Sequence, residues 1–162
     1  FEALKEPRGL LGPVEIEQGR YAEAVAALAA MNTSVNFSSV KYFDGNKTLL
    51  ELAGIAQVLL QQEGIEIAHL KMVMTADSSE LASAHATSSD AAPELEDQQS
   101  EPMQRGQMVL NLRAEGDPEL LHSAVNRAIM AMVDKSADLF ARMEESFYYR
   151  PEAPALLEAR LA

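Results

Sequence analysis

The stretch "IEIAHLKMVMTA" (65–76) decides the fold predicted for this chain. Its side chains alternate along the chain between two phases: Ala68, Leu70, Met72 and Met74 in one, and His69, Lys71 and Val73 in the other. A period of two residues places successive side chains on opposite faces of a β-strand. The stretch therefore predicts a strand with one face in the core and the other face turned outward.

The stretch "GQMVLNLRAEG" (106–116) repeats this alternation and predicts a second half-buried strand. Its inward and outward sets are Met108, Leu110, Leu112 and Ala114, and Val109, Asn111 and Arg113. A helix follows from the Asp117-Pro118 start signal, an N-cap with proline in the first turn. Another helix precedes 65–76, because a capping box at Thr48 and Glu51 leads into an apolar stripe that ends at Gly64. Asp44-Gly45-Asn46, just before that helix, has the composition of a turn.

Two further segments complete the predicted sheet. "SVNFSSVKYFD" (34–44) is rich in β-branched and aromatic residues, and the slip in its alternation at Ser38 and Ser39 indicates a β-bulge. "FARMEESFYYRPEAP" (140–154) is interpreted as a fourth strand that its two prolines end. The alternative for this last segment is a continuation of the preceding helix to about Ser146.

The order of these elements is a helix, a βαβ unit, a linker and a second βαβ unit. Two such units with right-handed crossovers predict an α+β fold, a ferredoxin-like split βαβ sandwich. An extra N-terminal helix is expected over 14–32, and the second sheet face is either free or covered by it. The expected organisation is an arm (1–13), a single α+β domain (14–154) and a C-terminal tail (155–162).

A long acidic insertion separates the two units. From Asp77 to Glu101 the chain has no lysine or arginine and few large apolar side chains. Such a segment buries too little surface to offset its ordering entropy, so 77–105 is predicted to be a mobile acidic loop. It is either a docking loop or lid, or an insertion tolerated at the tip of a hairpin.

Composition excludes several classes of function. The 162 residues carry a net charge of −12 and no cysteine, which disfavours nucleic-acid binding and rules out disulfides and thiolate chemistry. No apolar run is long enough to span a bilayer, and a cytoplasmic, membrane-independent protein is expected. The acidic residues lack calcium-loop spacing, the three histidines are scattered, and no phosphate-binding or nucleophile motif occurs. The sequence predicts no catalytic residue, metal or cofactor.

One set of outward side chains is a candidate binding site. His69 and Lys71 on one predicted strand share a face with Asn111 and Arg113 on its neighbour, and Lys41 joins them if the bulge allows. Such a cationic, hydrogen-bonding set suits an anion, an acidic partner segment or the chain's own acidic loop. The alternative is an ordinary solvated sheet face.

From Val35 onward the chain resembles the C-terminal domain attached to CobW-type GTPases and their bacterial relatives. The segments that carry the resemblance are "SVNFSSVKYF", "GIEIAHLKMVMTA", "AHATSSDAAPEL", "GQMVLNLRAEGDPELLHSAV" and "ESFYYRPEAP". The family's GTP-binding and metal motifs would lie in a preceding domain, and none occurs here. The chain begins with Phe1, so it is expected to be a trimmed domain of something longer or to lack its start.

The resemblance implies a non-catalytic accessory or interaction domain. Its partner would be a protein or a preceding GTPase-type domain, within a nucleotide-driven system for metal delivery or cofactor assembly. The alternative from the residues is a stand-alone regulatory domain that binds a small ligand or anion, with a homodimer as a further possibility.

Overall fold

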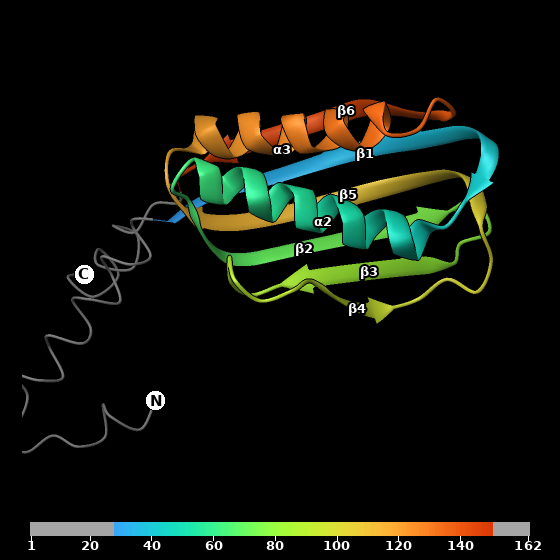
Figure 1. The fold of residues 1–162 in the computed structure, drawn as a ribbon, viewed down its shortest axis with the longest axis horizontal. Helices are drawn as coiled ribbons and strands as arrows, with labels where there is room; N and C mark the ends of the chain where they lie inside the picture. The colour runs from blue at the N-terminus through green and yellow to red at the C-terminus, as the bar shows by residue number, and fades with distance from the viewer. Residues whose placement is uncertain (1–27, 151–162) are drawn as a thin grey trace, which may run out of the picture.

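The computed structural model describes residues 28–150, which form one sheet and two helices. The elements are β1 (Leu28–Phe43), α2 (Gly45–Gln62), β2 (Glu66–Ala76), β3 (Leu81–Ala86), β4 (Glu94–Asp97), β5 (Met103–Glu115), α3 (Pro118–Asp134) and β6 (Leu139–Tyr149). The strands follow the order β4-β3-β2-β5-β1-β6, with every neighbouring pair antiparallel. Both helices lie side by side on one face of this sheet (Figure 1). The predicted α+β class is confirmed.

The hydrophobic core fills the layer between the helices and the sheet. The predicted alternation on β2 and β5 is confirmed, since these strands pair directly and their inward side chains are buried: Leu70, Met72, Met74, Met108, Leu110, Leu112 and Ala114. One inward assignment is wrong. Ala68 is exposed, because the β2–β5 register shifts between Ile67 and His69 and Ile67 takes the buried position.

Helix α2 begins earlier than predicted. Asp44 is its N-cap, and the Asp44 carboxylate accepts a hydrogen bond from the Lys47 backbone N–H at 3.2 Å. The Thr48 hydroxyl donates to the Asp44 carbonyl instead of capping a helix of its own. The predicted capping box is therefore wrong, and the expected turn at Gly45 is the first turn of the helix.

The other helix boundaries agree with the sequence. Gly64 follows α2 with a φ of +72°, the left-handed conformation that favours glycine after a helix. Asp117 caps α3 by accepting from the Glu119 backbone N–H at 2.9 Å, with Pro118 in the first turn. Strand β6 settles the choice at the C-terminal end, because the residues up to Ser146 are strand and not helix.

The N-terminal part of the sheet differs from the prediction. β1 begins at Leu28, so the helix expected over 14–32 is wrong for its last five residues, while its remainder lies outside the described residues. The arm (1–13) and the tail (155–162) also lie outside them. Alanine-rich sequence favours a helix, but pairing with β5 and β6 on both sides overrides that preference. The expected bulge is present as a register shift after Ser38.

The segment 77–105, predicted to be a loop, contains β3, β4 and the start of β5. β3 pairs with β2 from Leu70↔Ala86 to Thr75↔Leu81. The inward side chains of β3 are all alanines, and each is buried: Ala82, Ala84 and Ala86. These small side chains let β3 pack close to α2. A strand whose buried residues are alanines is missed when strands are predicted from large apolar residues.

Candidate binding site on the open sheet face

Neither helix covers the second face of the sheet (Figure 1). The strand positions that alternate with the buried ones point to this face, and most of them are polar. They include Asn32, Ser34, Asn36, His69, Lys71, Ser83, His85, Gln107, Asn111 and Arg113. This open sheet face is where the sequence places its candidate site.

The sheet brings together four of the five predicted site residues. His69 pairs with Arg113, and Lys71 pairs with Asn111, as direct cross-strand neighbours of β2 and β5. Directly opposed residues have their Cβ atoms about 4.5–5.5 Å apart. His69, Asn111 and Arg113 are exposed, and Lys71 is half-buried. We refer to these four residues as the polar patch.

Lys41 does not join the polar patch. Arg113 pairs with Ala30 on β1, and Lys41 lies eleven residues further along that strand. At a rise of about 3.3 Å per residue this separation is about 36 Å. The Lys41 ammonium instead lies 3.8 Å from an Asp138 carboxylate oxygen. The proposal that the bulge returns Lys41 to the site is therefore wrong.

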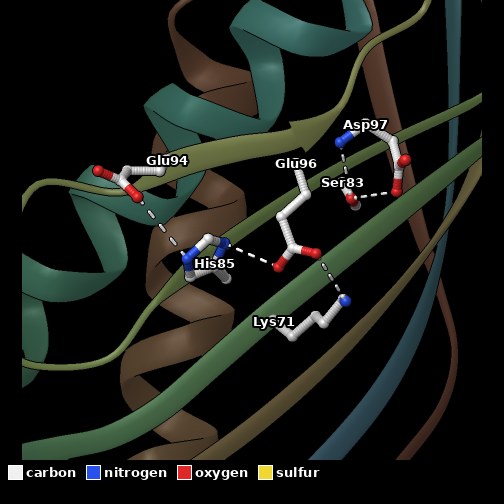
Figure 2. Close-up of polar contacts among 6 residues, drawn as sticks. All are labelled: Lys71, Ser83, His85, Glu94, Glu96 and Asp97. Atoms are coloured by element: carbon white, nitrogen blue, oxygen red, sulfur yellow. Dashed lines mark hydrogen bonds and ion pairs between the residues drawn. The ribbon is translucent and has the colours of Figure 1, made fainter.

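Glu96 of β4 reaches the polar patch from the acidic segment (Figure 2). One of its carboxylate oxygens lies 3.4 Å from the Lys71 ammonium, and the other lies 2.8 Å from His85 Nδ1. Glu94 lies 3.8 Å from His85 Nε2 on the other side of the ring. Lys71 is therefore paired with the acidic segment of the same chain, one of the three kinds of ligand that the sequence left open.

Hydrogen bonds fix β4 in the position that delivers Glu96. The Ser83 hydroxyl donates to the Asp97 carboxylate at 2.8 Å and accepts from the Asp97 backbone N–H at 3.1 Å (Figure 2). The sequence analysis did not include His85, Glu94, Glu96 or Asp97 in the site. For His85 the signal was its alternation, together with Ser83, with the alanines of β3.

The connection between β3 and β4 is held by the outer surface of α2. The Gln57 side chain, only 8% exposed, donates to the Ser88 carbonyl at 3.0 Å and to the Ala91 carbonyl at 2.7 Å. The Gln61 side chain donates to the Ser89 carbonyl at 2.7 Å. These hydrogen bonds satisfy carbonyl groups of the connection that are not paired within the sheet. Helix α2 therefore holds the acidic insertion in place.

A second anchor holds the segment between β4 and β5. The Asn46 amide donates to the Gln99 carbonyl at 2.9 Å, and its oxygen accepts from the Gln99 N–H at 2.8 Å. The Gln99 side chain donates to the Glu80 carbonyl at 3.1 Å. The Ser100 hydroxyl, and then its backbone N–H, donate to the Glu80 carboxylate and hold the pKa of Glu80 below its ordinary value.

The geometry limits the chemistry of the site. Within residues 28–150, no group of three or more His, Cys, Asp or Glu side chains is arranged to hold a metal ion. A hollow of about 420 Å³ lies at the other end of the sheet, lined in part by Asn36, Asp77 and Arg105, and includes no residue of the polar patch. The polar patch is thus separate from this hollow, and three of its four residues are exposed.

Neither α2 nor α3 is long and apolar enough to cross a membrane.

The fold and site define a two-layer α+β domain with an exposed polar sheet face. No protein-family model matches the chain, and no curated protein matches it. The solved structures that are similar to it include the following three. An amidase of the hydantoinase/carbamoylase family from Burkholderia multivorans has 15% identity and a TM-score of 0.42, with 83% of this chain and 33% of that chain covered.

The second is a VAO-type flavoprotein from Myceliophthora thermophila C1, with 13% identity, a TM-score of 0.38, and 80% and 20% of the two chains covered. The third is an aminobenzoyl-glutamate utilization protein from Klebsiella pneumoniae, with 15% identity, a TM-score of 0.35, and 81% and 31% covered. This chain spans a third or less of the length of each, and these similarities assign no activity to it.

Proposed function

We propose that this chain is a non-catalytic interaction domain whose polar patch binds an acidic segment of a partner protein. The cross-strand pairing of His69 with Arg113 and of Lys71 with Asn111 carries this proposal. It concentrates cationic and amide donors on one exposed surface of a chain whose net charge is −12. Carboxylates are the natural ligands of such donors, and a guanidinium can bind one through two parallel hydrogen bonds.

Arg113 is the central residue of the proposed site. Its side chain is exposed, and none of the ion pairs described within residues 28–150 includes it. Its neighbour His69 is also exposed. A partner carboxylate over Arg113 can accept from His69 and from the Asn111 amide without displacing any described contact.

The contact between Glu96 and Lys71 supports the same chemistry. A carboxylate carried by a neighbouring strand already lies 3.4 Å from the Lys71 ammonium on this face. A partner segment with acidic residues in alternate positions would repeat this contact over Arg113. The open surface around the patch suits an extended segment better than a small enclosed ligand.

The two βαβ units, β1-α2-β2 and β5-α3-β6, support the finer proposal of a ferredoxin-like split βαβ sandwich, with β3 and β4 as an addition to one edge. Together with the resemblance to domains attached to CobW-type GTPases, this favours an accessory role beside a nucleotide-driven metal-delivery or cofactor-assembly protein. The partner is then a separate protein or a preceding GTPase-type domain.

The test compares two double variants that remove equal charge. Lys71→Ala/Arg113→Ala removes both cations of the polar patch, and Lys41→Ala/Arg105→Ala removes two cations elsewhere. Binding of a fluorescent glutamate-rich peptide is followed by anisotropy at low and physiological salt. We expect the patch variant to bind about tenfold or more weakly, because charge-assisted hydrogen bonds contribute about 1.5–3 kcal/mol each. The control variant should bind like the wild type.

A third variant probes the internal carboxylate. Glu96→Gln should strengthen peptide binding, since it removes a charge that competes for Lys71. Equal affinities of the two double variants would refute the proposal. Thermal stabilisation by inorganic phosphate, without peptide binding, would support the alternative of a stand-alone anion-binding regulatory domain.

A further inference from the structure

The two edges of the sheet are unequally protected. The β4 edge is four residues long and carries three carboxylates, Glu94, Glu96 and Asp97. The β6 edge is eleven residues long, and no strand within residues 28–150 pairs with its outer side. Short, charged edges resist pairing with another chain, whereas long apolar edges favour it. The asymmetry points to β6 as an interaction surface.

Large exposed side chains concentrate on β6. Its exposed apolar residues are Phe140, Met143, Phe147, Tyr148 and Tyr149. Phe140 and Phe147 are 55% and 58% exposed. Tyr148 is fixed on the helix side by stacking on His122, with ring centroids 4.3 Å apart, so this part of the edge is already ordered.

We propose that β6 pairs antiparallel with β6 of a second copy of this chain, so that the two sheets become one. The side chains of β6 favour a second copy as the partner. β6 itself carries both residues of an oppositely charged pair and both residues of an aromatic pair, so two antiparallel β6 strands can form these contacts with each other. The inference is independent of the proposed binding of acidic segments.

A β-bulge sets which side chains share a face. The β1–β6 register shifts so that Glu145 pairs with Ser34 and Met143 with Val35, which leaves Glu144 as the extra residue. As a result Phe140 and Arg142 before the bulge lie on the same open face as Glu145 and Phe147 after it. Without the bulge, the two halves of the strand would present these residues on opposite faces.

One antiparallel register of the two β6 strands forms both an oppositely charged pair and an aromatic pair. When the two-fold axis passes between Met143 and Glu144, Arg142 lies opposite the partner's Glu145, and Phe140 lies opposite the partner's Phe147. Symmetry makes each pair occur twice. A shift by two residues in either direction places a charged side chain opposite a phenylalanine, so other registers lose both complementary pairs.

The existing contacts of the charged residues are compatible with this pairing. The Arg142 side chain is 83% exposed, and its Nε lies 3.8 Å from the Glu144 carboxylate, which also accepts from the Asn36 amide at 2.5 Å. Glu144 therefore keeps a partner when Arg142 turns to the second copy. Charges and a bulge on an edge strand discourage indiscriminate pairing, and here they leave one self-complementary register.

The first test uses charge exchange in the full chain, with mass measured by light scattering over a concentration series. The wild type should be dimeric at high concentration. Arg142→Glu and Glu145→Arg should each be monomeric, because like charges then face each other twice. A mixture of the two variants should form a heterodimer, since opposite charges again meet at both positions. A monomeric wild type, or variants that dimerise alone, would overturn the proposal.

The second test reports the register directly. The chain has no cysteine, so Phe140→Cys/Phe147→Cys introduces the only thiols. Oxidation should give a disulfide-linked dimer, because each cysteine faces the other member of the pair in the second copy. The control Phe140→Cys/Tyr149→Cys keeps both thiols on the open face but two residues out of register, and should stay largely unlinked. Equal cross-linking of both variants would exclude this register, and circular dichroism verifies folding.

Discussion

Ser89 provides the sharpest test of how the acidic insertion is held. Its side chain is 5% exposed, and its hydroxyl oxygen accepts from the Ile67 backbone N–H at 2.8 Å. β3 pairs with β2 only from Leu70 onward. The Ser89 hydroxyl therefore accepts a hydrogen bond from a β2 residue that β3 does not reach. Ser89→Ala leaves a buried N–H without an acceptor, which costs about 1–3 kcal/mol.

The expected loss is measurable by urea and thermal unfolding. For a domain of this size, each 1 kcal/mol lowers Tm by about 2–4 °C. Amide hydrogen exchange gives a local readout, because the Ile67 N–H should lose protection. The matched control is Ser88→Ala, whose hydroxyl accepts from the exposed Ala91 N–H at 3.0 Å, and its stability should change by about 0.5 kcal/mol or less. Equal stabilities of the two variants, with Ile67 exchange unchanged, would refute the reasoning.

Three further predictions concern α2 and the second anchor. Gly45→Ala should destabilise by about 1–3 kcal/mol in urea unfolding, because its Cβ would overlap the hydrogen-bonded Gln99 side chain. Gly54→Ala, with open space around it, should stabilise by about 0.5–1 kcal/mol. The lowered pKa of Glu80 means that its stabilising contribution is present above pH 4.5 and is lost as pH falls through the folded-state pKa. Ser100→Ala should raise that pKa toward its ordinary value in an NMR titration, and an unchanged titration would contradict the assigned cause.

The alternating strands could be predicted from the sequence because a period of two residues is a local signal. Leu70 and Leu112 are buried for the same reason that His69 and Arg113 are exposed. The proximity of the four residues of the polar patch could be predicted once these two strands were assumed to pair. Their exact register depends on the irregularity at Ala68, which no side-chain pattern announces.

The errors occurred where tertiary contacts override local preference. Ala29 and Ala30 have strong helix propensity, yet they lie in β1 between two paired strands. The acidic segment lacks large apolar residues, but the Gln57 and Gln61 amides satisfy three of its backbone carbonyls. Helix α2 also packs against β3, whose inward alanines are buried. The prediction for Lys41 was wrong because alternation indicates the face on which a residue lies, but not the register that decides which residues of the neighbouring strand lie opposite it.

The insertion connects the fold to the proposed binding chemistry. Without β3 and β4, β2 would be an open edge of the sheet, with Lys71 beside it. With them, that edge ends in a short strand of carboxylates, and one of these, Glu96, lies against Lys71. The same segment thus protects the sheet from pairing on one side and lowers the net charge of the polar patch. Arg113, on the next strand, is beyond the described contacts of Glu96. Any acidic partner would therefore meet its strongest donor at Arg113, and within residues 28–150 no strand pairs with the outer side of β6, where the proposed second copy would bind.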